Sequence, residues 1–350
     1  MNEATEIRPA AQPATSAPAT RPDDWASDQE VRWCPGCGDY AILKAIQRTL
    51  PELGAEPHKT AFISGIGCSS RFPYYMETYG FHTIHGRAPA IATGVKLANP
   101  DLDVWLITGD GDGLSIGGNH MLHLLRRNLD CQVLLFNNEI YGLTKGQYSP
   151  TSRPGTTTPT SPGGSLDQPV KPCAFAIGAG GRFVARCIDT DQKRLPDIFK
   201  RAHAFKGTGF IEIYQNCVVF NDGVFENFTG KKTAPQTQLW AEHGKPLLFD
   251  NGTRGLRLDR NTLRLEVIAV TDANLNEVLV HDETNKLIAN LLIDMPFPEF
   301  PVALGVLYTE PSPSYEQAVV EQGRRLAAGK AADLGALLRR GQTWKVELRR

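Results

Sequence analysis

The stretch GDGDG at residues 109–113 decides the fold, because it joins a buried strand to an amphipathic helix. The apolar run VWLIT at 104–108 precedes it, and an unbroken run of this kind is typical of a strand in a parallel sheet. Apolar residues then recur at helical spacing from about 115 to 127, and a second apolar run follows at 132–136. This order predicts an α/β fold with a doubly wound, mostly parallel sheet and helices on both faces.

Two oxygen ligands follow neighbouring strands of this predicted sheet. Asp110 ends the first strand and Asn138 ends the second. Adjacent parallel strands lie roughly 5 Å apart, so both side chains can reach one ion. Mg²⁺ commonly takes one or two protein oxygens and completes its shell with phosphate and water. The alternative is an ordinary strand–helix–strand unit with a glycine turn and an asparagine cap.

The spacing from GDGDG to NNEIYGLT at residues 137–144 resembles the thiamine diphosphate motif. This resemblance implies that Asp110 and Asn138 bind Mg²⁺ through their side chains and that Ile140 binds it through its backbone carbonyl. We expect further contacts to the cofactor from the same loops. The predicted cofactor-binding residues are Gly109, Asp110, Gly111, Asp112, Asn138, Ile140, Gly142, Leu143, Thr144, Cys68 and Ser69.

The composition narrows the class of protein. The chain has 350 residues, a hydrophobic content of 41% and a formal net charge of -1, which argues against a nucleic-acid-binding protein. Its apolar stretches are too short to span a membrane. The first thirty residues are rich in Pro, Ala and Thr and lack the apolar core of a signal peptide. We therefore expect a cytoplasmic protein that acts away from membranes.

Three regions follow from the composition along the chain. Residues 1–27 are predicted to be a disordered tail. Residues 28–229 hold every chemical motif and are predicted to form the cofactor-binding α/β domain. Residues 230–350 lack such motifs and are predicted to be an extension that packs on this domain or on a partner subunit. The Thr-, Ser-, Pro- and Gly-rich stretch 148–172 is too long for a simple connection.

The chain has seven cysteines, and four of them fall at turns or strand ends, where ligands of one metal site can converge. These four are Cys34, Cys37, Cys68 and Cys217. Disulfides are rare in the cytoplasm, so metal binding is the better interpretation. Four thiolates suit tetrahedral zinc or an iron–sulfur cluster, and their spacing does not separate the two.

The remaining cysteines are predicted to be structural. Cys131 lies in the approach to a strand, Cys173 in a loop and Cys187 in a strand.

The thiamine diphosphate motif favours the iron–sulfur alternative. Decarboxylation of a 2-oxo acid on thiamine leaves an electron-rich species, and a nearby cluster is a natural one-electron acceptor. Two other classes remain as alternatives. One is a thiamine-dependent decarboxylase or synthase without redox chemistry. The other is a zinc-stapled interaction subunit without catalytic activity.

Taken together, these segments resemble the β subunits of the 2-oxoacid:ferredoxin oxidoreductases over most of residues 31–225. The segments that carry the resemblance are WCPGCGDY (33–40), GIGCSSR (65–71), HGRAPAIATGVKLANP (85–100), GDGDGLSIGGNH (109–120), NNEIYGLTKGQ (137–147) and the one around Cys217. The resemblance implies a thiamine-diphosphate-binding fold, Mg²⁺ and one [4Fe-4S] cluster on the four cysteines.

The resemblance also implies partners. An α subunit, in an αβ or α2β2 assembly, supplies the carboxylate that activates the aminopyrimidine and much of the pocket for CoA and the 2-oxo acid. Ferredoxin accepts the electrons. The chain alone is therefore expected to be inactive.

Three residues are predicted to act on the substrate or the thiamine ring: His85, Lys145 and Arg71. An ammonium group at 145 resembles the 2-oxoglutarate or broad-range group, where it can pair with the distal carboxylate, and Arg71 can do the same. The alternatives are that Lys145 only contacts phosphate and that His85 is a surface group. We expect 2-oxoglutarate as the substrate and succinyl-CoA and CO₂ as products. A pyruvate or broad-range 2-oxoacid enzyme is the alternative.

Overall fold

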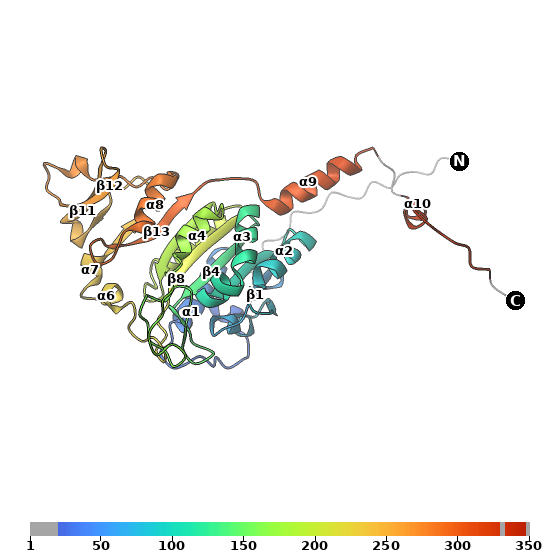
Figure 1. Ribbon diagram of the computed structural model, residues 1–350. Coiled ribbons are helices and arrows are strands. Elements are labelled where there is room, and N and C mark those ends of the chain that lie inside the picture. The colour runs from blue at the N-terminus through green and yellow to red at the C-terminus, as the bar shows by residue number, and fades with distance from the viewer. Residues whose placement is uncertain (1–19, 330–332, 348–350) are drawn as a thin grey trace.

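The computed structural model describes residues 20–329 and 333–347. Its centre is an eight-stranded sheet, in which all neighbouring strands are parallel except the pair β7–β13. Helices flank this sheet in Figure 1. The strands, in spatial order, are β2 (Tyr79–His82), β1 (Thr60–Ser64), β3 (Asp103–Gly109), β4 (Cys131–Asn137), β8 (Thr208–Tyr214), β7 (Phe183–Ile188), β13 (Val302–Thr309) and β9 (Gln238–Ala241).

Smaller elements surround this sheet. Three strands form an antiparallel sheet, β10 (Leu248–Phe249), β11 (Arg254–Asp259) and β12 (Arg264–Ala269), and two form a short hairpin, β5 (Ile140–Tyr141) and β6 (Gln147–Tyr148). The described α-helices are α1 (Asp39–Glu52), α2 (Ala88–Ala98), α3 (Gly118–Arg127), α4 (Pro172–Gly178), α5 (Leu195–Ala204), α6 (Glu226–Thr229), α7 (Ala234–Thr237), α8 (Lys286–Asp294), α9 (Tyr315–Ala327) and α10 (Leu334–Leu338). The short helical turns are η1 (Pro22–Trp25), η2 (Pro57–Lys59), η3 (Ser69–Tyr75), η4 (Asp112–Ile116), η5 (Asp250–Gly252) and η6 (Leu275–Glu277).

The sheet separates two large apolar cores. In β3, Val104 and Leu106 face a core shared with helices α2, α3, α4 and α8. Trp105 and Ile107 face the opposite core, which includes helices α1 and α5. This alternation is the two-residue period of a strand, and burial on both faces explains why the sequence is continuously apolar. The predicted doubly wound α/β fold is confirmed.

The strands predicted around the glycine-rich loop are confirmed, but the helix after it differs in detail. Residues 112–116 form a π-helical turn, and the regular helix α3 begins only at Gly118. Such turns are frequent at functional sites because they displace side chains from the regular helical path. Cys173 lies in helix α4 rather than in the expected loop. Its residues are apolar enough to bury this helix against the sheet.

The C-terminal third contributes to the main sheet. Strands β13 and β9, both beyond residue 229, extend the sheet past β7. The expected β pieces at 256–258 and 265–270 lie in β11 and β12, and the late helical stretch contains α9 and α10. The predicted boundary at residue 230 therefore does not coincide with an edge of the sheet. In Figure 1 the chain leaves the body after β13 and continues into α9.

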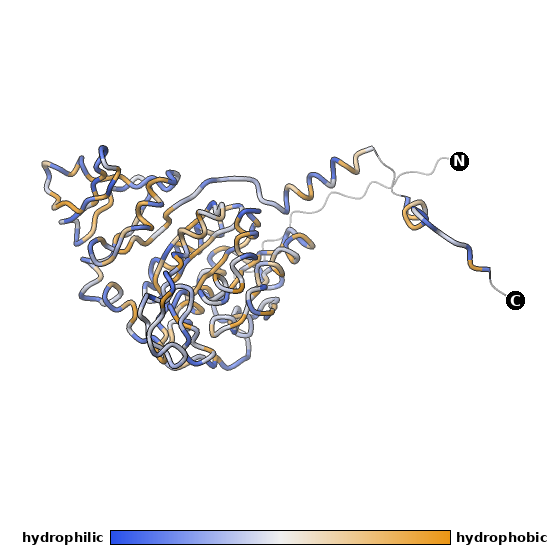
Figure 2. The backbone as a smooth tube through the Cα atoms, in the orientation of Figure 1, coloured by the Kyte–Doolittle hydropathy of each residue, from blue (hydrophilic) through white to orange (hydrophobic). Residues whose placement is uncertain are grey.

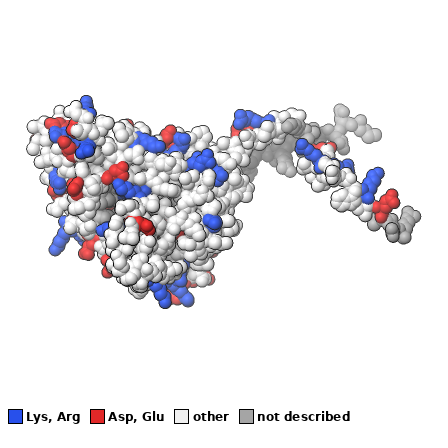
Figure 3. All heavy atoms as spheres, in the orientation of Figure 1, with Lys and Arg blue, Asp and Glu red and all other residues white. Residues whose placement is uncertain are grey.

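The surface carries charge of both signs. On the face shown in Figure 3, basic and acidic side chains are interspersed rather than separated into two areas. Figure 2 shows hydrophobic residues along the strands of the central sheet and an alternation of polar and apolar residues along α9. None of the helices in the described part of the chain is long and apolar enough to cross a membrane.

The described residues include the last part of the predicted tail. Most of the predicted tail lies outside the described residues, but Thr20 to Ser27 are described, and Trp25 is fully buried in the core beside α1. Its indole Nε1 donates to Thr20 Oγ1 at 3.0 Å, and its carbonyl accepts from Glu77 N at 2.9 Å. The burial of Trp25 anchors this segment, but the polar residues around it in the chain form no apolar pattern that would predict its burial.

We predict that Trp25→Ala lowers the free energy of unfolding by about 3–5 kcal/mol, because it leaves a large cavity in the core. Trp344→Ala is the matched control: Trp344 is 84% exposed, and surface substitutions usually change stability by less than about 0.5 kcal/mol. Chemical denaturation of both variants checks this. Equal stability of the two variants would show that Trp25 is not part of the core.

Candidate active site at the carboxyl edge of the sheet

Asp112 ties three loops together at the carboxyl edge of the sheet. Its Oδ1 accepts hydrogen bonds from His85 Nδ1 at 2.6 Å, Gly86 N at 2.7 Å and Ile66 N at 3.0 Å. Its Oδ2 accepts from Thr108 Oγ1 at 2.6 Å. The carboxylate is thus occupied by protein donors, so Asp112 shapes the loop around a ligand. His85 is held by one ring nitrogen while its side chain stays 37% exposed.

Asp110 is the buried carboxylate at the end of β3. It is 1% exposed, and its Oδ2 accepts from Ser149 Oγ at 2.5 Å and from Thr151 Oγ1 at 2.6 Å. Burial is the main cause that raises its pKa from 3.8 to about 6, although the two hydroxyls act in the opposite direction. The side-chain partners that the structure describes for this group are neutral. A divalent cation would therefore relieve the cost of burying its charge.

The two asparagines after β4 have different surroundings. Asn137 Oδ1 accepts from Thr151 Oγ1 at 3.0 Å, so Thr151 bridges Asn137 to Asp110. Asn138 Nδ2 donates to Gln215 Oε1 at 2.8 Å, while Asn138 Oδ1 accepts from Ile140 N at 3.2 Å. Among the described residues, the side-chain oxygen of the predicted ligand Asn138 thus accepts this one long hydrogen bond.

Glycine is required at position 111 because the ring of Tyr141 lies too close for a side chain. A Cβ on Gly111 would lie 2.1 Å from the ring of Tyr141, whose hydroxyl donates to Gly111 O at 3.1 Å. A Cβ on Gly109 would meet Ser69 Oγ at 3.6 Å. The predicted cofactor residues Gly109, Gly111 and Ser69 therefore lie in one tightly packed group. Ile140 is buried in strand β5, next to this group.

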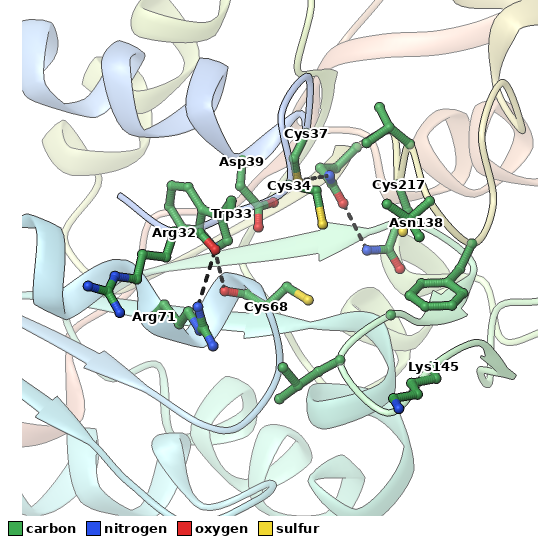
Figure 4. A pocket seen from close by; sticks show the side chains of 16 residues that line it. Arg32, Trp33, Cys34, Cys37, Asp39, Cys68, Arg71, Asn138, Lys145 and Cys217 are labelled. Atoms are coloured by element: carbon green, nitrogen blue, oxygen red, sulfur yellow. Dashed lines mark hydrogen bonds between the residues drawn. The ribbon is translucent and has the colours of Figure 1, made fainter. Parts of the chain in front are cut away.

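Four cysteines line one cavity of about 240 Å³. They are the four predicted as ligands, Cys34, Cys37, Cys68 and Cys217, and Figure 4 shows them around the cavity together with Asn138. The backbone of Gly142 forms part of the wall, since a Cβ there would lie 3.4 Å from Cys217 Sγ and 3.6 Å from Cys68 Sγ.

These thiols are costly to ionise without a cation. Burial raises the pKa of Cys68 to about 11, and Asp39 and the neighbouring thiols act in the same direction. Burial also raises the pKa of Cys37 strongly, again with contributions from Asp39 and from two other cysteines of the cavity. A thiolate is the form that binds metal, and a bound metal stabilises it. The arrangement is therefore suited to a positively charged metal group.

The remaining cysteines are separate from this cavity. Cys131, Cys173 and Cys187 are all buried in the cores.

Basic side chains lie at the rim of the cysteine cavity. Arg71 and Lys145 both line the cavity, and Arg71 Nη1 donates to Arg32 O at 3.3 Å. Figure 4 shows Lys145 at the lower right, apart from the four cysteines. Leu143, which is 45% exposed, also lines it. Thr144 instead donates its hydroxyl to the side chain of Gln147, so it does not face the cavity partners.

Sequence reasoning missed several polar residues of this region. Ser149 and Thr151 hold Asp110 from within the stretch 148–172, which the sequence marked only as long and polar. Asp39, next to the CxxC turn, lines the cysteine cavity and is 1% exposed. Burial, with a contribution from Asp189, raises its pKa to about 7. The sequence shows that Ser149, Thr151 and Asp39 are polar, but it does not show which residues they contact, because those residues are distant in sequence.

The glycine-rich loop at the end of β3, its buried carboxylate and the asparagine after the adjacent strand define the class of thiamine diphosphate enzymes. Residues 65–213 match the family described as "Thiamine pyrophosphate enzyme, C-terminal TPP binding domain". The carboxyl ends of β1, β3, β4 and β8 all lie within this segment or at its border.

Comparison with individual proteins gives the family. The chain is 46% identical to the 2-oxoglutarate oxidoreductase subunit KorB of Mycobacterium tuberculosis, over 96% of this chain and 91% of that protein. It is 50% identical to the β subunit of 2-oxoacid:ferredoxin oxidoreductase 1 of Aeropyrum pernix, over 54% of this chain and 60% of that one. The chain therefore belongs to the β subunits of the 2-oxoacid:ferredoxin oxidoreductases.

A solved structure agrees. The 2-oxoglutarate:ferredoxin oxidoreductase from Magnetococcus marinus, with 2-oxoglutarate, coenzyme A and succinyl-CoA bound, superposes with a TM-score of 0.74. The alignment covers 93% of this chain and 97% of that one, at 32% identity.

We predict that Asp110→Asn stabilises the chain when divalent cations are chelated. Burial raises the folded-state pKa from 3.8 to about 6. The folded protein therefore becomes less stable as the pH rises through this window, because the buried carboxylate must ionise. Removing the charge should increase the free energy of unfolding at pH 7.5 by up to about 3 kcal/mol, and the gain should shrink toward pH 4. Urea unfolding in the presence of a chelator measures it.

The matched control is Asp112→Asn. The carboxylate of Asp112 accepts from backbone and side-chain donors on two loops and on strand β3, and an amide can satisfy fewer of them, so this variant should be less stable than the wild type. Destabilisation by Asp110→Asn at pH 7.5 would contradict the account of Asp110.

Proposed function

We propose that this chain is the β subunit of a CoA-dependent 2-oxoglutarate:ferredoxin oxidoreductase, which converts 2-oxoglutarate to succinyl-CoA and CO₂. The observation that carries this proposal is the convergence of four cysteines on one cavity whose wall includes Asn138, a predicted Mg²⁺ ligand. The similarity to a 2-oxoglutarate oxidoreductase subunit across nearly the whole chain supports the choice of substrate.

Mg²⁺ fits the residues at the end of β3. The carboxylate of Asp110 is buried and has neutral side-chain partners, so a bound cation would balance its charge. Asp110 would bind Mg²⁺ through its carboxylate, Asn138 through Oδ1 and Ile140 through its carbonyl. These are hard oxygen ligands, and the diphosphate of the cofactor would complete the shell. The tight packing of Gly111 against Tyr141 leaves backbone, rather than side chains, next to the phosphates.

The cysteine cavity fits a cluster better than a single zinc ion. Its volume is about 240 Å³ and all four thiols line it. Across the described ranges, 20–329 and 333–347, no group of three or more His, Cys, Asp and Glu residues is arranged to hold one metal ion. Thiols that surround a space, rather than a point, favour a [4Fe-4S] group of several atoms. The proposed cluster ligands are Cys34, Cys37, Cys68 and Cys217.

The chain's own residues would orient the reactants. When bound, thiamine diphosphate supplies the nucleophile and electron sink for decarboxylation, and the cluster accepts electrons singly. Asp112 holds His85 by its Nδ1, and the partly exposed ring would contact the thiamine ring or the substrate. Lys145 and Arg71 lie at the cavity rim, where their charges would attract the two carboxylates of 2-oxoglutarate and hold the substrate for reaction.

The proposed function requires partners. An α subunit, in an αβ or α2β2 assembly, would complete the active site and much of the CoA pocket, and ferredoxin would take the electrons from the cluster. Arg32, which lines the cysteine cavity, supplies positive charge that suits an acidic electron carrier. The cytoplasm is the proposed compartment.

The experiment is anaerobic co-expression with the α subunit, followed by CoA-dependent dye reduction with different 2-oxo acids. We predict that kcat/KM is higher for 2-oxoglutarate than for pyruvate. Lys145→Met should raise KM for 2-oxoglutarate about tenfold, because it removes one charge–charge contact worth about 1.4 kcal/mol, and should leave KM for pyruvate nearly unchanged.

Lys59→Met is the control variant, because Lys59 is exposed and pairs with Glu56 away from the site. It should behave as the wild type with both substrates. Equal kcat/KM for pyruvate and 2-oxoglutarate in the wild type would identify a broad-range enzyme instead. A complex that holds zinc and no iron would support the non-catalytic alternative.

A further inference from the structure

Gln215 connects the proposed Mg²⁺ site with the proposed cluster site. It follows strand β8 and is 1% exposed. Its Nε2 donates to Cys37 Sγ at 3.2 Å and to Asn216 O at 2.7 Å. Its Oε1 accepts from Asn138 Nδ2 at 2.8 Å. The two bonds that link Cys37 with Asn138 can be followed in Figure 4.

These contacts fix the orientation of two amides. A flipped Gln215 would place its carbonyl oxygen against Asn216 O and against a sulfur, and would bring its NH₂ group to the NH₂ group of Asn138. Both arrangements lose hydrogen bonds, so the network allows one orientation. Asn138 must then give its Nδ2 to Gln215, and its Oδ1 is the atom that remains for a cation.

We propose that Gln215 is a positioning residue that supports both cofactor sites through one side chain, an inference that rests on the proposed function. Its N–H bond to Cys37 makes the cluster easier to reduce, because reduction adds negative charge to the sulfurs and a donor stabilises that charge. Its carbonyl holds the amide of Asn138 so that Oδ1 stays directed to Mg²⁺. Partners of this kind around a metal ligand strengthen metal binding.

A purely structural role would have different consequences. The bond to Asn216 O is local and could simply stabilise the turn that carries Cys217. Loss of that bond would lower the stability of the chain. It would not change the potential of an intact cluster or the affinity for thiamine diphosphate. The potential and the affinity therefore distinguish a positioning role from a structural one.

Two substitutions separate the two contacts. Gln215→Met removes these two contacts and the bond to Asn216 O without adding charge. Gln215→Glu keeps an acceptor for Asn138, removes the donor to Cys37 and adds a negative charge that also disfavours reduction. The matched control is Gln132→Met, because Gln132 is also buried, at 2% exposure, but lies at the opposite end of the sheet, with its amide directed to Ala202 O at 3.4 Å.

The measurements use the anaerobic complex with its α subunit. An EPR-monitored titration gives the midpoint potential of the cluster, and calorimetry with thiamine diphosphate and Mg²⁺ on the cofactor-depleted complex gives Kd. We expect Gln215→Met to lower the equilibrium constant for one-electron reduction about tenfold, which equals about 59 mV, and to raise Kd about tenfold. Gln215→Glu should lower the potential while Kd stays within about twofold of wild type.

The Gln132→Met complex should match the wild type in both measurements. A Gln215→Met complex with unchanged potential or unchanged Kd overturns the inference, as does an equal shift in Gln132→Met. If Gln215→Met does not assemble, Gln215→Glu decides: an unchanged potential overturns the inference. A wild-type complex without iron or without bound thiamine diphosphate overturns the proposed function as well.

Discussion

The order of the strands is the constraint on which the site depends. Strands β1, β3, β4 and β8 are adjacent and parallel, so their carboxyl ends meet at one edge of the sheet. Each is followed within a few residues by a group of the site: Cys68, Asp110, Asn138 and Cys217 in that order. The CxxC turn before α1 reaches the same edge. Backbone hydrogen bonding thus assembles chemistry from five distant segments, as expected for ligand sites of open α/β sheets.

Burial gives this edge its chemical character. Asp110 and the thiols of Cys37 and Cys68 all have pKa values raised by burial. Burial thus makes ionisation of these groups costly, and cationic groups would stabilise the ionised forms. The fold therefore carries an electrostatic cost at the site that cofactor binding would offset. Four protein donors surround the carboxylate of Asp112, which holds the neighbouring loops in place.

The sequence predicted those parts of the fold and the site whose signals are local. The strands beside GDGDG are continuously apolar because they are buried on both faces, and the cysteines and Asp110 stand directly at turns and strand ends. What it missed depends on contacts between distant segments. Ser149 and Thr151 become part of the site because their loop folds back and brings their hydroxyls to Asp110. Strands β13 and β9 follow a region with no motif, and their pairing with the main sheet is a long-range event.

The most direct test is the structure of the complex with its α subunit, crystallised anaerobically with thiamine diphosphate and Mg²⁺, with diffraction data collected at the iron absorption edge. The account predicts anomalous density for several iron atoms inside the cavity of Cys34, Cys37, Cys68 and Cys217. It also predicts diphosphate density beside Asp110, at the same edge of the sheet. Iron density elsewhere, a single zinc atom among the cysteines, or a diphosphate away from Asp110 would contradict it.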